Sequence, residues 1–303
     1  MRVVFMGTPL FAIPSLQGIY ENYELVGVVT QPDKHNSNSF VKDFAIKNNI
    51  LLLQPIDIKS EYFEIIKLKP DLIVTCAYGQ IIPDEIIDYP KYGCINIHAS
   101  LLPKLRGGAP IHKAIIEGYE KTGITIMYMN SKMDQGDIIS QLEVDIDFND
   151  NYTSLHNKMM YVAKNLVLST IENIKSEKNN RTKQDHSIAT YAWNIKREDE
   201  KINFDKSKLE VYNKIRGLSE TPGAFCYYEG KICKVFKAKI GENHFMGING
   251  EIGKVYNDGI GIKLNNGEII FEEIQIEGKK RLKVSEFLNG IQNKESLIGK
   301  VLE

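Results

Sequence analysis

Residues 96–111 read NIHASLLPKLRGGAPI and join an apolar strand to a loop punctuated by proline and glycine. Successive side chains of a strand face opposite sides, so Asn96 and His98 share one face. They stand at the carboxyl end of the run 94–98, where open α/β sheets bind ligands. The glycines at 107 and 108 let the backbone approach a ligand closely. The stretch therefore predicts a binding site, although both side chains would equally well cap loose backbone groups at the strand end.

Apolar runs on both sides of this stretch alternate with helical patterns. Strands are predicted at 2–7, 24–30, 50–54, 71–79, 94–98 and 122–129, and helices at 9–22, 38–48, 58–68, 110–118 and 152–177. This rhythm is typical of βαβ units. We therefore expect an α/β domain with a mostly parallel sheet and helices on both of its faces.

The residue composition and the predicted secondary structure change after about residue 178. The polar, charged run 176–187 indicates an exposed connector. Beyond residue 205, one helical run is followed by short strands with turn signals at 229–230, 257–259 and 265–267. Antiparallel strands at this spacing predict a small β-barrel. The predicted division is a first domain over 1–180, a linker over 181–204 and a second domain over 205–303.

Composition sets limits on location and chemistry. The 303 residues are 43% hydrophobic and 25% charged with a net charge of -1, which excludes neither a nucleic-acid partner nor a small acidic substrate. No run approaches the ~18–20 apolar residues of a membrane span, and the amino terminus turns polar too soon for a secretory signal. Four cysteines without CxxC or Cys/His metal spacing predict reduced thiols, a cytoplasmic protein and no bound metal.

A second loop, 128–139, follows the strand at 122–129 and carries Asp134 and Asp137 around Gly136. A carboxylate close to His98 would fix its tautomer and favour the imidazolium. Asn, His and Asp side chains that converge at strand ends suit acyl transfer through an oxyanion. The competing interpretation makes Asp134 a solvated turn residue.

Several familiar motifs are missing. The segment MGTP at 6–9 has one glycine where a dinucleotide fingerprint needs three, so a nicotinamide dehydrogenase is disfavoured. No P-loop occurs, and no serine or cysteine lies in a GxSxG context. A covalent acyl-enzyme is therefore not expected, and the attacking group would come from the substrate.

Seven segments resemble the methionyl-tRNA formyltransferase family in order and spacing: VVFMGTPLFAIPSL, VTQPD, AYGQIIP, CINIHASLLPKLRGGAPI, TGITIMYMNSKMDQGDI, TYAWNI and TPGAF. The resemblance runs from Arg2 to about Lys300. It implies a Rossmann-like domain followed by an OB-like barrel that helps to hold tRNA. It also implies formyl transfer from 10-formyltetrahydrofolate to the α-amino group of initiator methionyl-tRNA, with no metal and no obligate protein partner.

The resemblance assigns catalysis to Asn96, His98 and Asp134. The amine would attack the formyl carbon, and Asn96 Nδ2 and protonated His98 would stabilise the negative oxygen of the tetrahedral intermediate. Asp134 would keep His98 charged, and which residue moves the proton stays open. Two segments would line the folate pocket: Ser100, Leu101, Leu102 and Pro103, and Tyr78, Gly79, Gln80, Ile81 and Ile82.

Binding of tRNA is expected to rest on basic residues: Lys34, Lys42, Arg106, Lys279, Lys280, Arg281 and Lys283. Arg106 would equally suit a plain surface cation, and the run 277–283 a solvated face. Members of the family carry a longer, glycine-rich basic loop where this chain has 34–43, so the second domain is expected to contribute more. In the second domain, no aromatic stacking platform is expected to stand clear of core packing.

Three other interpretations stay open. A formyltransferase for a nucleotide-linked amino sugar would share the NIH, SLLPK and DQGD segments, and the short basic loop favours it slightly. A purine-pathway formyltransferase would share the catalytic trio but end near residue ~200, without a second domain. A non-catalytic tRNA-binding protein would have no need of the trio.

Overall fold

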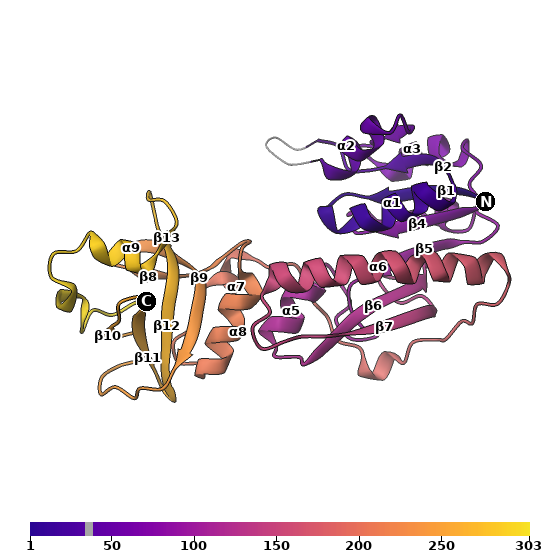
Figure 1. Cartoon of the computed structure of the whole chain (residues 1–303). Helices are drawn as coiled ribbons and strands as arrows, with labels where there is room; N and C mark the ends of the chain where they lie inside the picture. The colour runs from indigo at the N-terminus through magenta and orange to yellow at the C-terminus, as the bar shows by residue number, and fades with distance from the viewer. Residues whose placement is uncertain (34–38) are drawn as a thin grey trace. The chain divides into compact units, whose positions relative to one another are not determined.

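The computed structural model describes residues 1–33 and 39–303, which form two compact units (Figure 1). The first unit holds residues 1–110, 121–145 and 156–193, and the second holds 111–120, 146–155 and 194–303. Within the expected linker, Thr182 pairs with Ile138 of the first unit, and the Ile202 amide donates to the Phe225 carbonyl of the second. The division at residues 180 and 205 stays a prediction.

The first unit is built on a seven-stranded sheet in the order β3-β2-β1-β4-β5-β6-β7. Its strands are β1 (Arg2–Gly7), β2 (Glu24–Val29), β3 (Leu52–Leu53), β4 (Leu72–Cys76), β5 (Cys94–His98), β6 (Lys121–Tyr128) and β7 (Ile138–Asp145). The four pairings from β3 to β5 are parallel, and β6 and β7 are antiparallel to their neighbours. The predicted mostly parallel sheet is confirmed.

Helices cover both faces of this sheet. The elements of this unit are η1 (Leu10–Ala12), α1 (Ile13–Asn22), α2 (Phe40–Lys47), α3 (Ile58–Ile66), α4 (Asp84–Ile87), α6 (Tyr152–Lys175) and η2 (His186–Ile188), whereas α5 (Pro110–Ile116) falls in the second unit apart from Pro110. Val4 and Met6 of β1 pack in one buried cluster with α3 and α4. Phe5 points the other way and meets Ala12 of η1 at Gly7.

Two edge strands depart from the predicted pattern. β3 is only two residues long where 50–54 was expected, and short edge strands are common because they offer few unpaired groups. β7 was not predicted, because most of its side chains are exposed or half-buried and it lacks an apolar run. It forms a hairpin with β6 around the loop that carries Asp134.

The second unit is an antiparallel sheet of six strands in the order β10-β11-β12-β9-β8, with β13 paired to β12. Its strands are β8 (Ala224–Tyr228), β9 (Lys231–Gly241), β10 (Ile252–Val255), β11 (Ile260–Leu264), β12 (Gly267–Ile276) and β13 (Leu282–Lys283). Its helices are α7 (Arg197–Glu200), α8 (Lys208–Leu218), α9 (Val284–Asn289) and η3 (Lys294–Leu297). All three predicted turns connect strands where they were expected.

Residues 299–303 close this sheet into a barrel. The Glu303 and Tyr227 backbones exchange hydrogen bonds of 2.6 and 3.0 Å, which attaches the segment to β8. On its other side, the Ile252 amide of β10 donates to Lys300, and Leu302 donates to Gly250. Closure leaves neither outer strand with an open edge along this segment.

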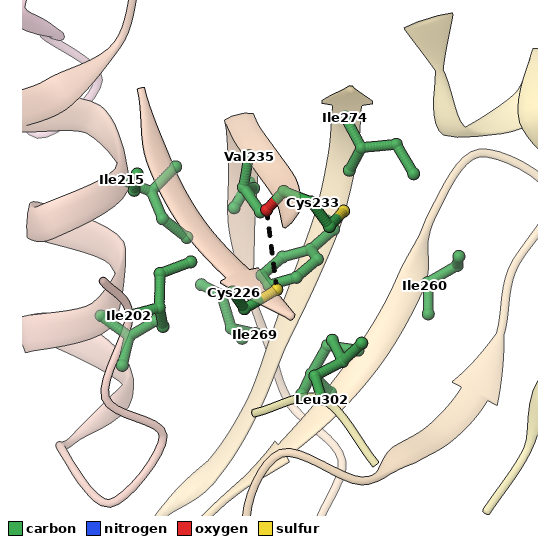
Figure 2. Packing of buried hydrophobic residues seen from close by; sticks show 14 of the residues in the cluster. Ile202, Ile215, Cys226, Cys233, Val235, Ile260, Ile269, Ile274 and Leu302 are labelled. Carbon is green, nitrogen blue, oxygen red and sulfur yellow. Dashed lines mark hydrogen bonds between the residues drawn. The ribbon is translucent and has the colours of Figure 1, made fainter. Parts of the chain in front are cut away.

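The barrel interior is apolar (Figure 2). Cys226 and Cys233 lie opposite each other on β8 and β9, and the Cys226 thiol donates to the Cys233 carbonyl over 3.8 Å. The neighbouring Cys233 side chain and burial raise the pKa of Cys226 well above its usual range, so the Cys226 thiol stays protonated. Each buried Ile, Leu or Val here stabilises the fold by roughly 1.5–3 kcal/mol.

Hydrogen bonds of His112 and Arg216 connect the segments 111–120 and 146–155 to α8. His112 Nδ1 lies 2.8 Å from the Gly217 carbonyl. Arg216 donates to the carbonyl oxygens of Asp150 and Asp147 at 2.7 and 3.2 Å. Burial lowers the pKa of Arg216, yet the guanidinium remains bonded to backbone oxygens. These bonds explain why both segments belong to the second unit.

In the described part of the chain, no helix has the length and apolar character needed to cross a membrane.

Candidate active site

Asn96 lies near the carboxyl end of β5, between β4 and β6. It pairs with Thr75 of the parallel strand β4. The Thr75 hydroxyl donates to Asn96 Oδ1 over 2.7 Å. This bond commits the amide oxygen and leaves Nδ2 with no protein acceptor among the described residues. The amide N–H groups are therefore available to an oxygen atom of a ligand.

His98 ends the same strand and is 6% exposed. Its Nε2 lies 3.0 Å from the Leu105 carbonyl oxygen. Because a carbonyl can only accept, the proton belongs on Nε2. His98 Nδ1 then faces Asp134, whose Oδ1 is 3.7 Å away. The structure thus brings the predicted partners together, with the imidazole oriented by Leu105.

Asp134 is held from two sides. The Gly107 amide donates to its Oδ2 over 2.8 Å, so Oδ1 is the oxygen left for His98. Its backbone has a φ of 52°, a left-handed conformation that Asp tolerates better than most residues. At Gly136, a Cβ atom would lie 1.7 Å from the Tyr128 carbonyl oxygen, so only glycine fits. The backbone of the MDQGD segment therefore directs the Asp134 carboxylate towards His98.

Arg106, predicted to contact tRNA, is instead buried. It is 1% exposed, and its guanidinium donates to Gln184 Oε1 at 2.6 and 3.2 Å. Gln184 Nε2 donates in turn to the carbonyl oxygens of Asp134 and Gly136 at 2.9 and 2.8 Å. The interpretation of Arg106 as an exposed cation was wrong, because the neighbouring segment 184–192 covers it.

The loop that follows β5 carries the first predicted folate segment. The Ser100 hydroxyl donates to the Lys104 carbonyl over 2.6 Å, and Leu102 is 3% exposed. Leu101 packs against Gly123 of β6, where a Cβ atom would come within 2.5 Å of it. Pro103 follows a cis peptide bond and is half-buried. Most of these side chains thus shape the loop itself.

Thr125 of β6 fixes that loop and was not among the predicted site residues. Its hydroxyl donates to the Ser100 carbonyl over 2.6 Å and accepts from the Leu102 amide over 3.1 Å. Gln141 Nε2 donates to both Thr125 Oγ1 and the Leu102 carbonyl. The only signal in the sequence was that Thr125 is a polar residue within the apolar predicted strand 122–129.

The second predicted folate segment, 77–82, leaves β4 beside Asn96. Gln80 donates to the Pro55 carbonyl over 3.1 Å, and Ile82 is 5% exposed. Ile81 is 75% exposed, and Gly79 has a φ of 92° that favours glycine. The buried Tyr78 hydroxyl has no hydrogen-bond partner among the described residues, and burial raises its pKa. Ile81 is therefore open to a ligand in this segment, whereas the Tyr78 ring and hydroxyl lie in the buried cluster.

The nearby thiols cannot act as nucleophiles. Cys76 and Cys94 lie on β4 and β5 and are 0% and 1% exposed. Burial raises the pKa of Cys76 to about 12 and also raises that of Cys94. Both sulfurs are therefore protonated and shielded at neutral pH. In the described residues, no cluster of three or more His, Cys, Asp or Glu side chains has the arrangement to hold a metal ion.

Of the two lysines in the first unit predicted to bind tRNA, Lys42 is the one that the structure describes, and it offers little free charge. Lys34 lies outside the described residues. Lys42 forms an ion pair with Asp33, whose pKa is lowered by that contact.

The four cations of the second unit that were predicted to bind tRNA fall into two groups. Arg281 donates to the carboxylates of Glu220 and Glu273, which raises its pKa and neutralises its charge locally. The exposed members of the run are Lys279, Lys280 and Lys283.

Comparison with known proteins gives matches over both units. The family model "Formyl transferase" matches residues 1–171, and "Formyl transferase, C-terminal domain" matches 194–292. A methionyl-tRNA formyltransferase of Bacillus licheniformis is 46% identical over 299 residues, covering 95% of this chain and 95% of that protein.

Solved structures of low identity share the fold. A sugar 3N-formyl transferase, crystallised in the presence of dTDP and 5-N-formyl-THF, gives a TM-score of 0.68 at 22% identity over 92% of this chain and 99% of that one. A methionyl-tRNA formyltransferase from Clostridium thermocellum gives 0.59 at 20% identity, covering 91% and 98%.

Proposed function

This chain belongs to the methionyl-tRNA formyltransferase family, and we propose that it formylates the α-amino group of initiator methionyl-tRNA by direct amine attack. The donor, 10-formyltetrahydrofolate, supplies an activated formyl group. The observation that carries the mechanism is the convergence of Asn96, His98 and Asp134 at one edge of the sheet. The product, formylmethionyl-tRNA, would serve translation initiation.

Asn96 would stabilise the negative charge that develops on the formyl oxygen. Its Oδ1 accepts from Thr75, so the N–H groups of Nδ2 point away from that contact. A donor fixed in this way needs no reorganisation when charge develops, which makes it effective in a partly buried site. Thr75 would therefore act through Asn96 as a positioning residue.

His98 and Asp134 would handle the proton of the attacking amine. Nε2 of His98 is committed to Leu105, so proton exchange would use Nδ1. Asp134 Oδ1 faces that nitrogen at 3.7 Å and can stabilise a proton there. The Gly107 amide holds the carboxylate itself, and Gln184 holds the backbone carbonyl of Asp134. The nucleophile is the substrate amine, because the nearby thiols are buried and protonated.

For the formyl donor, we propose the segments 77–82 and 100–103 as the binding walls. Ile81 would offer an apolar contact, and the buried Tyr78 would support the segment from within the core. Ser100 and Leu102 would act by shaping the loop. A cytoplasmic location and action without an obligate protein partner complete the proposal.

A transfer assay tests this function directly. Mixing the protein with labelled 10-formyltetrahydrofolate and methionyl-tRNA should give formylmethionyl-tRNA, with no label on the protein when the tRNA is left out. Covalent label on the protein would contradict direct attack, and absence of the product would contradict the function.

We further propose that the second unit holds tRNA mainly through Lys279, Lys280 and Lys283. Neutralising the three lysines should raise the KM for methionyl-tRNA and lower the salt slope of binding by about one unit for each phosphate that is no longer neutralised. Measuring KM at two salt concentrations checks this. Neutralising Lys42 should do less, because Asp33 already pairs with it. A triple variant with wild-type salt dependence would contradict the proposal.

A further inference from the structure

Two aromatic rings form an exposed stack in the first unit. Tyr191 and Trp193 are two residues apart in an extended segment, so their side chains share one face. Their ring centroids are 5.2 Å apart and their planes differ by 5°. They remain 43% and 58% exposed. The pattern YAW was the available signal in the sequence.

This aromatic stack lies beside residues 105–109, a strip of backbone that hydrogen-bonds to the side chains of His98 and Asp134. The Ala192 amide donates to the Arg106 carbonyl over 2.6 Å, and the Arg106 amide donates to Thr190 over 2.9 Å. The same strip supplies the Leu105 carbonyl to His98 and the Gly107 amide to Asp134. Neighbouring extended segments lie about 4.8 Å apart. The stack therefore sits one segment away from the residues that orient the trio.

Glycine at position 107 makes this closeness possible. A Cβ atom there would lie 2.8 Å from the Ala192 carbonyl oxygen, and φ is 110°. The Ala109 amide also donates to that carbonyl over 3.0 Å. The RGGAP and TYAW segments, far apart in the chain, thus form one rigid surface element.

The chemistry of this surface suits an unpaired nucleobase. Exposed aromatic rings are the usual platforms for single-stranded nucleic acid, because every base has a π-face. In the proposed reaction, the amine is esterified to the terminal nucleotide of the tRNA. When that amine reaches His98 and Asp134, the unpaired end of the tRNA must pass close to the strip at 105–109.

We propose that Tyr191 and Trp193 form a stacking platform for a base of the unpaired acceptor end of the tRNA. This inference rests on the proposed function and assigns to that site two residues that position the acceptor. The formyl donor is not the proposed occupant, because its proposed walls follow β4 and the loop after β5, whereas the platform belongs to segment 190–193.

Alanine variants separate acceptor binding from donor binding. Tyr191→Ala and Trp193→Ala should each raise the KM for methionyl-tRNA by about 10-fold, in keeping with the loss of one stacking partner. The KM for 10-formyltetrahydrofolate should stay near its wild-type value, and Trp193→Phe should restore most of the affinity. Tyr161→Ala is the matched control, because that tyrosine is 60% exposed on α6.

Fluorescence gives a readout independent of turnover. The chain holds a single tryptophan, so its emission reports on Trp193 alone. Titration with intact uncharged tRNA should change that emission, and tRNA shortened by its unpaired terminal nucleotides should not. Tyr191→Ala should weaken the response to intact tRNA.

The outcomes are distinguishable from failure of the function itself. If the wild-type protein formylates methionyl-tRNA but both alanine variants keep its KM, the platform is wrong. A rise in the KM for the formyl donor instead would place the donor on these rings and also overturn the inference. If the wild-type protein forms no formylmethionyl-tRNA, the proposed function is what fails.

Discussion

Asn96→Asp is expected to lower kcat for formyl transfer by about 10²–10³-fold, the usual loss when one oxyanion donor is removed. The substitution is nearly isosteric, and it keeps an oxygen where Thr75 donates over 2.7 Å. It replaces the free Nδ2 donor by a carboxylate oxygen, which repels a developing oxyanion. Steady-state kinetics with both substrates saturating would measure the loss.

Asn130→Asp is the matched control for this change. Asn130 is exposed, and its Oδ1 accepts from the Lys132 amide over 2.9 Å, a bond that an aspartate retains. The kcat of the Asn130→Asp variant should stay close to that of the wild-type protein. An Asn96→Asp variant that turns over normally would remove Asn96 from the oxyanion site.

His98→Ala is expected to lower kcat by ~10² or more, because it removes the imidazole whose Nδ1 would exchange the proton of the attacking amine. The change also leaves the Leu105 carbonyl without its 3.0 Å partner, so some loss of stability is expected. His98→Gln retains a side chain that can donate to Leu105, and it should recover stability without recovering turnover.

Melting curves recorded beside the kinetics separate the two effects. His244→Ala serves as a control, because that histidine is exposed in the second unit. If His98→Gln both melts and turns over like the wild-type protein, His98 has no part in the chemistry.

Sequence patterns were sufficient to predict the structure where a rule about neighbouring residues applies. Strand alternation placed Asn96 and His98 on one face, and the structure puts both beside Thr75 and Thr125 at the expected edge. The parallel strands were recognised because they are buried on both faces and read as apolar runs.

Contacts between distant segments could not be read in this way. Gln184 holds the Asp134 loop from 50 positions away, and nothing in the local sequence distinguishes it from a surface glutamine. Arg106 looked like a loop cation because the segment that covers it begins 78 residues later. Its burial follows from tertiary packing, which overrides local polarity.

Ion pairs explain why a cation predicted to bind tRNA can lack free charge in the structure. Arg281 reads as part of a basic run, but Glu220 lies 61 positions away in the chain and neutralises it. The charge available to a phosphate therefore depends on partners that no short window of sequence contains.

The most direct test of the central claim offers two acceptors at once. The wild-type protein would be given labelled 10-formyltetrahydrofolate together with methionyl-tRNA and a nucleotide-linked amino sugar, and the label would be followed into each product. The account predicts label on the methionine of the tRNA, with the rate of transfer lowered about 10²–10³-fold by Asn96→Asp. Label on the amino sugar and none on methionyl-tRNA would contradict it.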